Sequence, residues 1–236
     1  MDRGIAETRS MAQGMIMAGE VSHNTTKLTK PGQVFEDDIE LQIAERPRYV
    51  SRGGDKLASV AKELGLNFKD AVVLDVGSST GGFTDYALQN GAKKVYAVDV
   101  GTNQLAYKLR NVDRIVVMEQ IDIRDIDGHL LDPTPNIAVI DVSFISLTKI
   151  LESVANLITD YGQIVAMAKP QFETDKPTAD KYKGVIKDEK LRAQILVDFE
   201  SKIEDNFEII AKKDSDVRGA QGNRERFYLI VPNDNV

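Results

Sequence analysis

The chain has 236 residues, of which 42% are hydrophobic and 28% are charged, and its formal net charge at pH 7 is −7. This length and composition suit one large α/β domain with a small appendage. The absence of cysteine excludes disulfides and thiolate metal sites and favours a reducing compartment, the cytoplasm. We expect no metal site, because the two histidines are far apart, and no exported or membrane-spanning segment, because no apolar run is long enough.

The first part of the chain contains short and irregular elements. Turn residues such as Lys30-Pro31-Gly32 separate them, and Gly19 ends the first helix. The expected elements are a helix over 8–18, a short strand with a turn over 20–27, and a half-buried strand over 39–43. We predict a small α+β domain over residues 1–45, followed by a linker over 46–52.

The remainder, residues 53–236, alternates strands and helices as βαβ units do. The expected strands are apolar runs at 71–76, 94–100, 114–118, 136–142, 163–168, 207–212 and 226–231. The expected helices span 51–64, 83–89, 103–110, 146–159 and 188–204. The polar segment 173–186 is predicted to be a long loop and a candidate substrate loop. The alternation predicts a doubly wound seven-stranded sheet, mostly parallel, with helices on both faces and ligands at the carboxyl ends of its strands.

A glycine-rich loop joins the first of these strands to a helix. It opens with the carboxylate of Asp75 and lacks the G-x-G-x-x-G pattern of dinucleotide sites. A carboxylate there repels phosphate and suits a cationic ligand, such as the amino group or sulfonium of S-adenosylmethionine. Asp99 is expected to bind ribose hydroxyls and Asp122 the adenine amino group. Alternative interpretations are a tight turn with solvated acids and, for Asp122, a helix N-cap.

The predicted cofactor site consists of residues at strand ends and in that loop. Its members are Asp75, Gly77, Ser78, Ser79, Thr80, Gly81, Gly82, Phe83, Asp99, Val100, Asp122, Ile123 and Asp141. A further residue, Lys169, ends the fifth strand, where burying an ammonium group costs several kcal/mol (order of magnitude) unless it is paired. Asp141 at the neighbouring strand end is the expected partner; a purely structural ion pair is the alternative.

Several motifs together carry a resemblance. They are Ser51-Arg52-Gly53-Gly54-x-Lys56-Leu57, the loop from Asp75 to Phe83, Asp141-Val142-Ser143-Phe144, Lys169-Pro170-Gln171-Phe172-Glu173 and Gly222-Asn223-x-Glu225. Over nearly its whole length the chain resembles the hemolysin A (TlyA) family, within the FtsJ-like ribose methyltransferases. The resemblance implies a Rossmann-like class I methyltransferase fold. It also implies a catalytic Lys-Asp-Lys-Glu tetrad at Lys56, Asp141, Lys169 and Glu225, although the family's Glu-Phe is Glu225-Arg226-Phe227 here.

The N-terminal part resembles the small RNA-binding domain first described in ribosomal protein S-four. The matching residues are Arg3-Gly4-x-Ala6-x-x-Arg9-Ser10, Gly19-x-Val21 and Lys30-Pro31-Gly32. The family's first helix has no counterpart, so we expect an incomplete domain. The predicted RNA-binding residues are Arg3, Arg9, Arg46, Arg48 and Arg52. For the last three, which cluster with Lys56, a solvated helix start is the alternative; for Phe144 and Phe172 we expect either base stacking or core packing.

The activity implied is methylation of a ribose 2′-hydroxyl of ribosomal RNA, free or in a ribosomal subunit, with S-adenosylmethionine as cofactor and no metal or membrane. Lys169 would act as general base, with a pKa lowered by burial or by Lys56, or would orient the hydroxyl while water takes the proton. Asp141 would steady Lys169, and Glu225 would hold Lys56.

Three other functions stay open. A nicotinamide-dependent oxidoreductase is disfavoured by the missing G-x-G-x-x-G pattern. A non-catalytic RNA-binding protein on the same fold is disfavoured by the presence of Lys56, Asp141 and Lys169. A membrane-damaging haemolysin is disfavoured because the sequence predicts no spanning or strongly basic amphipathic helix.

Overall fold

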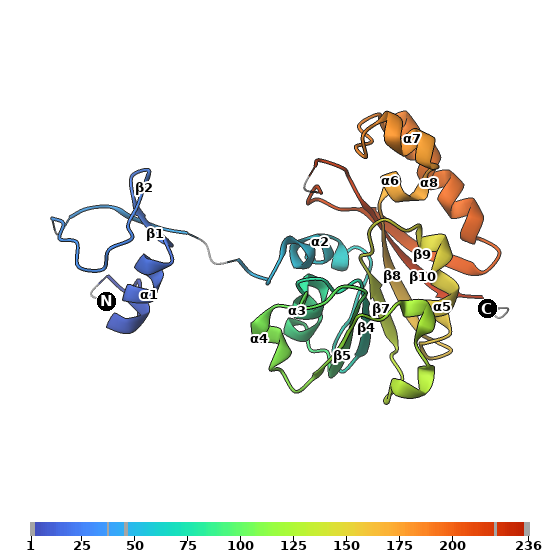
Figure 1. Ribbon diagram of the computed structural model, residues 1–236, viewed down its shortest axis with the longest axis horizontal. Coiled ribbons are helices and arrows are strands. Elements are labelled where there is room, and N and C mark those ends of the chain that lie inside the picture. The colour runs from blue at the N-terminus through green and yellow to red at the C-terminus, as the bar shows by residue number, and fades with distance from the viewer. Residues whose placement is uncertain (1–2, 37, 45–46, 220, 234–236) are drawn as a thin grey trace. The chain divides into compact units, whose positions relative to one another are not determined.

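The computed structural model describes residues 3–36, 38–44, 47–219 and 221–233. The chain forms two compact units, Met1–Arg48 and Tyr49–Val236, which are described separately (Figure 1).

The first unit is a small α+β structure. Its elements are α1 (Arg9–Met17), β1 (Val21–His23), β2 (Thr26–Lys27) and β3 (Leu41–Ile43). The Thr8 side chain caps α1 by accepting from the Met11 amide, as a residue before a helix commonly does. The strands form an antiparallel sheet in the order β2-β1-β3. A small apolar core joins the helix to the sheet; its buried members are Ala6, Met15, Val21 and Leu28.

The second unit is built on the expected seven-stranded sheet, so the predicted fold class is confirmed. Its strands are β4 (Val72–Val76), β5 (Lys94–Asp99), β6 (Ile115–Glu119), β7 (Ile137–Ile140), β8 (Gln163–Ala168), β9 (Phe207–Asp214) and β10 (Arg226–Pro232). They lie in the order β6-β5-β4-β7-β8-β10-β9, and β10 runs antiparallel to both neighbours while the first five strands are parallel. The strand order reverses between β4 and β7, which is where ligands of such sheets bind.

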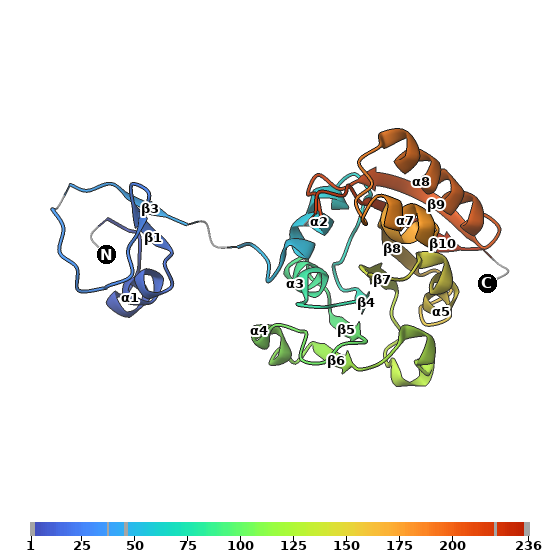
Figure 2. The same cartoon turned by 45° about the horizontal axis from the view of Figure 1, so that its top comes forward.

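Helices cover both faces of this sheet (Figures 1 and 2). The α-helices are α2 (Arg52–Ala61), α3 (Gly82–Gln89), α4 (Tyr107–Arg110), α5 (Leu151–Ala155), α6 (Pro170–Glu173), α7 (Lys176–Lys181) and α8 (Glu189–Ile203). Three short 3-10 helices are η1 (Ile123–Asp125), η2 (Gly128–Leu130) and η3 (Leu147–Lys149). Along β4, Leu74 packs on the α5 and α8 side and Val73 on the α2 and α3 side. The strands are therefore apolar on both faces, as parallel strands between helical layers are.

Three local expectations were wrong. The segment 173–186 was predicted to be a loop but contains α7. The Asp175 side chain caps this helix by accepting from the Thr178 amide at 2.7 Å, and Pro177 lies in the first turn, where a missing N–H is tolerated.

The second wrong expectation is the helix over 103–110, which is limited to α4. The Glu119 carboxylate accepts from the amides of three residues before this helix, Asn103, Gln104 and Leu105.

The third concerns the helix expected over 146–159, which is broken into η3 and α5. The buried carboxylate of Glu173 accepts from the Leu147 amide at 3.0 Å and from the Ser146 hydroxyl at 2.6 Å, so this turn is held by a side chain. None of the helices within the described residues is long and apolar enough to cross a membrane.

Candidate active site

The glycine-rich loop after β4 approaches the end of β7 closely. Gly77 has a φ of +78°, and a Cβ atom there would lie 2.8 Å from the Asp141 carbonyl oxygen. Gly82 opens α3 against the start of α2, where a Cβ atom would lie 2.7 Å from the Gly54 amide nitrogen. Glycine is needed at both positions because backbone occupies the space of a side chain. The two close approaches bring β7, α2 and the loop together at the carboxyl end of the sheet.

Two hollows of about 390 Å³ each flank this loop, and both are lined by Gly77, Ser79 and Asp141. The predicted cofactor residues that also line the first are Asp99, Val100, Asp122 and Ile123. Those that also line the second are Asp75, Ser78, Thr80, Gly82 and Phe83. Gly81 has a different role: its φ is +96°, and a Cβ atom there would meet the side chains of Leu105 and Leu109. The structure therefore brings twelve of the thirteen predicted residues around the two hollows.

Asp75 is a fully buried carboxylate on the wall of the second hollow. The Thr84 hydroxyl donates to its Oδ2 at 2.5 Å, whereas Oδ1 has no hydrogen-bond partner among the described residues. Burial raises the pKa of Asp75 to about 7, and the nearby carboxylate of Asp141 acts in the same direction. A buried acceptor without a donor is costly, so this oxygen is suited to a cationic or hydrogen-bond-donating ligand group.

Asp99 and Asp122 are held in fixed orientations on the wall of the first hollow. The Asp99 carboxylate accepts from the Ser79 amide at 2.8 Å and from the Gly101 amide at 2.7 Å. Asp122 caps η1 and accepts two bonds from the Arg124 guanidinium, which lower its pKa to about 2. Asp122 thus has the N-cap geometry that was its alternative interpretation, while it also faces the hollow.

Lys169 and Asp141 form an ion pair where β8 and β7 end. The Lys169 Nζ lies 2.6 Å from Asp141 Oδ1 and donates to the Ser143 hydroxyl at 2.9 Å. The Lys169 side chain is only 11% exposed, which fits the expectation that it needs a partner. Asp141 lines both hollows, so Lys169 lies next to their wall through its contact with Asp141.

Lys56 and Glu225 form a second ion pair at the same end of the sheet. The Lys56 Nζ, from α2, lies 3.2 Å from Glu225 Oε1, and the Glu225 side chain is 3% exposed. Glu225 Oε2 is buried and accepts no bond within the described chain. Arg226 lies opposite Ala168 in the β8–β10 ladder, so the next residues along, Glu225 and Lys169, are neighbours at the sheet end. All four expected tetrad residues therefore lie at one end of the sheet.

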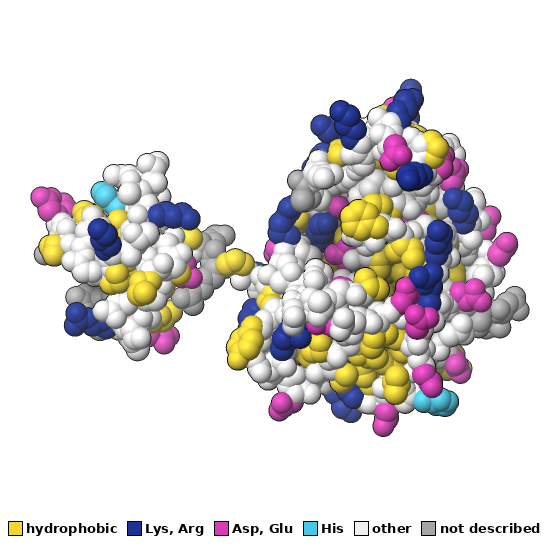
Figure 3. All heavy atoms as spheres, viewed as in Figure 1, with side chains coloured by type: hydrophobic (Ala, Val, Ile, Leu, Met, Phe, Trp, Pro, Cys, Tyr) yellow, Lys and Arg dark blue, Asp and Glu magenta, His cyan; other side chains and the backbone are white. Residues whose placement is uncertain are grey.

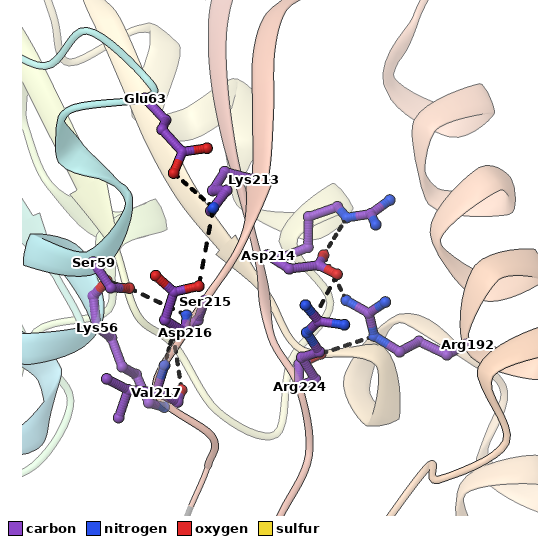
Figure 4. Close-up of polar contacts among 11 residues, drawn as sticks. Lys56, Ser59, Glu63, Arg192, Lys213, Asp214, Ser215, Asp216, Val217 and Arg224 are labelled. Carbon is purple, nitrogen blue, oxygen red and sulfur yellow. Dashed lines mark hydrogen bonds and ion pairs between the residues drawn. The ribbon is translucent and has the colours of Figure 1, made fainter.

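The segment before Glu225 is anchored on both sides (Figure 4). Toward α2, Lys213 lies 2.7 Å from Glu63, and the Asp216 amide donates to the Ser59 hydroxyl at 3.3 Å. Away from α2, one carboxylate joins two strands and a helix: Asp214 contacts Arg192 at 2.7 Å, Arg226 at 2.6 Å and Arg224 at 3.5 Å. These contacts anchor the backbone of the β9–β10 connection, which carries Glu225.

The predicted RNA-binding residues are spread over both units. In the first, the Arg3 guanidinium donates to the Ile39 carbonyl, and Arg9 and Arg48 are exposed. Arg46 lies outside the described residues. In the second, Arg52 is exposed at the start of α2 and donates to the Arg218 carbonyl.

Phe144 lies on the surface of the second unit, so the core-packing interpretation of this residue was wrong. It is 91% exposed and has a φ of +65°, which is rare for a residue with a bulky side chain. Its ring centroid lies 5.2 Å from that of Phe172.

Thr84, Ser143 and Asn223 were given no role in the site by sequence reasoning, although the last two belong to the motifs that carry the family resemblance. Thr84 and Ser143 contact Asp75 and Lys169. Asn223 is buried, and its carboxamide bonds to the backbone of residues 184 and 186. A polar residue in the first turn of the helix after the loop was a signal for Thr84. For Asn223 the contact is made across 37 residues, and no local pattern indicates it.

Comparison with known proteins identifies relatives over the whole second unit. A model of the FtsJ-like methyltransferases matches residues 49–231. YqxC of Bacillus subtilis, a candidate rRNA methyltransferase, is 48% identical over 198 residues, which are 83% of this chain and 70% of that protein. The 16S/23S rRNA (cytidine-2′-O)-methyltransferase TlyA of Mycobacterium tuberculosis is 34% identical over 232 residues, 97% of this chain and 86% of that one. A solved structure of a candidate hemolysin from Streptococcus thermophilus matches with a TM-score of 0.76 and 40% identity, covering 99% of this chain and 86% of that chain.

Proposed function

Since this chain belongs to the FtsJ-like methyltransferase family, we propose that it methylates a ribose 2′-hydroxyl of ribosomal RNA with S-adenosylmethionine as methyl donor. The relative named as a 16S/23S rRNA (cytidine-2′-O)-methyltransferase supports ribosomal RNA as the substrate and a cytidine as the modified nucleotide. The observation that carries the proposal is the Lys169–Asp141 pair at 2.6 Å, whose Asp141 lines both hollows.

The residues around the hollows fit S-adenosylmethionine. The orphaned Oδ1 of Asp75 would accept from its amino group, and Asp99 retains acceptor lone pairs for the two ribose hydroxyls. Asp122 and Ile123 would border the adenine. The cofactor supplies a methyl group bound to a positively charged sulfur, and a carboxylate-lined wall suits that charge better than it suits a phosphate.

In the proposed mechanism, Lys169 holds the ribose hydroxyl at the rim of the hollows. The cofactor would supply an electrophilic methyl group to the hydroxyl oxygen, and the hydroxyl proton would leave to water or to Lys169 in its neutral amine form. Asp141 and Ser143 fix the direction of the Lys169 ammonium. Lys56, held by Glu225, adds a second positive charge on the hydroxyl's side of the site. Orienting the hydroxyl for in-line attack is the main contribution of these residues.

We further propose that residues 1–45 form a domain that helps to recruit the RNA. Arg9, exposed on α1, and Arg3 are its candidate phosphate contacts. With ribosomal RNA as substrate, the cytoplasm is the expected location.

The test is transfer of labelled methyl groups from S-adenosylmethionine to unmodified ribosomal subunits, followed by nucleoside analysis. A labelled 2′-O-methyl nucleoside is expected with the native protein and with Lys62→Ala, an exposed lysine at the end of α2. Lys169→Ala is expected to lose transfer while it still binds the cofactor. Unchanged transfer by Lys169→Ala would contradict the mechanism, and failure of the native protein to bind the cofactor would favour a non-catalytic RNA-binding protein.

A further inference from the structure

A run of exposed lysines follows α6 and continues to the start of α8. We call residues 174–187 the lysine segment. It contains Lys176, Lys181, Lys183 and Lys187, all exposed, and none forms an ion pair with a described residue. Against these four, the segment has two aspartates, one of which, Asp175, is engaged as the cap of α7. The segment therefore carries a local positive charge on a chain whose net charge is −7.

A groove of about 800 Å³ leads from the lysine segment toward the hollows. Lys176, Ala179 and Gly184 of the segment line one part of it, and Phe144 and Ile145 line another. Its charged lining residues are three exposed lysines and three carboxylates: Lys149, Lys176, Lys202, Glu173, Asp175 and Asp180. Glu173 is buried and accepts from Leu147 and Ser146, and Asp175 caps α7. The other lysines of the segment lie beside the groove. The same Phe144 and Ile145 also line the first hollow. A polymer whose reacting group lies at the rim of the hollow can thus continue along this groove. Figure 3 shows Lys and Arg side chains gathered over the end of the unit that carries α7.

Asn223 fixes the lysine segment relative to the expected catalytic residues. Its Oδ1 accepts from the Ile186 amide at 2.9 Å and its Nδ2 donates to the Gly184 carbonyl at 2.8 Å, so both ends of the carboxamide bind the segment. Two residues further on, Glu225 pairs with Lys56. The end of the segment that carries Lys183 and Lys187 is therefore tied to the stretch of chain that carries Glu225.

We propose that the lysine segment is an RNA-docking surface that binds phosphates of the strand next to the modified nucleotide, with that strand lying along the groove. The inference rests on the proposed function and adds to it a second contact surface, distinct from residues 1–45. An RNA backbone is the occupant that the charge favours, because lysines bind phosphates as point charges and release counterions. Because the net charge of the chain is −7, attraction of RNA phosphates depends on a local group of positive charges, and the lysines of this segment form one.

The experiment measures binding of the full chain to unmodified ribosomal subunits at several salt concentrations. The test variant combines Lys176→Gln, Lys183→Gln and Lys187→Gln. Lys181 is left unchanged because its ammonium lies over the Tyr182 ring, and replacing it would remove this contact as well as a charge. The matched control combines Lys62→Gln, Lys69→Gln and Lys93→Gln, which remove the same charge from exposed positions outside both the lysine segment and the groove.

The test variant is expected to bind at least tenfold more weakly, and the slope of log K against log salt is expected to decrease by about 2 to 3, since each phosphate contact contributes roughly 0.7–0.9. Its affinity for S-adenosylmethionine is expected to equal that of the native protein, which also reports correct folding. Equal binding by the test and control variants would overturn the docking surface.

The outcome for the proposed function is read separately from methyl transfer. If the native protein methylates the subunits and the test variant binds like the control, the docking surface fails and the methyltransferase assignment stands. If lysine-dependent binding occurs without any methyl transfer, the docking surface stands and the assignment fails. Absence of any binding by the native protein would overturn both.

Discussion

Thr84 donates its hydroxyl to Oδ2 of the buried Asp75 at 2.5 Å, and the other oxygen of this carboxylate has no partner in the described chain. The carboxylate is thus oriented by the protein but incompletely satisfied. One oxygen of the group is fixed by Thr84 of α3, and the residue lines the second hollow.

The affinity for S-adenosylmethionine is expected to increase with pH because Asp75 must be ionised to bind a cation. Burial raises the pKa of Asp75 to about 7, so the protonated form, which binds poorly, predominates below that pH and disappears above it. Between about pH 6 and about pH 7.5 the dissociation constant is expected to fall about eightfold. The charged groups that face Asp75 are Asp141 and Asp99, and both favour its protonated form.

Titration calorimetry across this range measures the effect, with Asp75→Asn as the control. The amide keeps the shape and the bond from Thr84 but does not ionise, so the variant is expected to bind weakly and with no pH dependence from this position. A dissociation constant of the native protein that stays constant over the range would contradict the assignment of Asp75.

Thr84→Val is expected to weaken both folding and cofactor binding. The substitution keeps the volume of Thr84 but removes its hydroxyl donor, so that the backbone amide at position 84 is the donor left to this buried carboxylate; the expected cost is about 1–3 kcal/mol of unfolding free energy. With one of its two bonds lost, the carboxylate is less firmly oriented, so the affinity for S-adenosylmethionine is expected to fall at least fivefold. Urea denaturation and calorimetry measure the two effects. Thr84→Ser restores the hydroxyl and should recover most of both; equal behaviour of the valine and serine variants would show that the hydroxyl plays no part.

Lys56→Met is expected to destabilise the fold as well as abolish methyl transfer. It leaves the Glu225 carboxylate, 3% exposed, without its counter-ion, and losing one partner of a buried pair costs roughly 3–5 kcal/mol. Combining it with Glu225→Leu removes the unpaired charge, so the double variant should be more stable than Lys56→Met while still inactive. Thermal denaturation and the transfer assay measure the two properties. A double variant whose destabilisation is the sum of the single ones would contradict direct pairing.

Gly54→Ala is expected to destabilise the second unit through overpacking at the start of α2. A Cβ atom at Gly54 would lie 2.7 Å from Tyr49 Cδ2, and this ring is buried and has little room to move. The expected cost is about 1–3 kcal/mol. Gly53→Ala is the control, because its nearest contact would be an ordinary 3.4 Å and alanine favours a helix. The denaturation midpoint of Gly54→Ala is expected to be lower than that of Gly53→Ala. A smaller loss of unfolding free energy for Gly54→Ala than for Gly53→Ala would be inconsistent with the packing.

The sequence by itself determined the layout of the second unit and the residue types at its strand ends. Apolar runs such as 72–76 and 163–168 are local signals, and their alternation with helices implies a parallel sheet. Placing Asp75 and Asp99 at strand ends, and Asp141 and Lys169 at the ends of the next strands, then sufficed to predict a shared site, because parallel strands end at one edge. The family resemblance added Lys56 and Glu225, for which periodicity offers no signal.

Only the tertiary structure decided how these groups pair and which of them stay unsatisfied. The Lys56–Glu225 contact spans 169 residues and depends on β10 entering the sheet antiparallel to β8. The packing of distant segments likewise determines which oxygen of Asp75 lacks a donor and how exposed Phe144 is. It also determines which backbone groups the Asn223 carboxamide binds. Local sequence encodes helix and strand preference, whereas burial and hydrogen bonding of a particular atom are set by what the remainder of the chain places beside it.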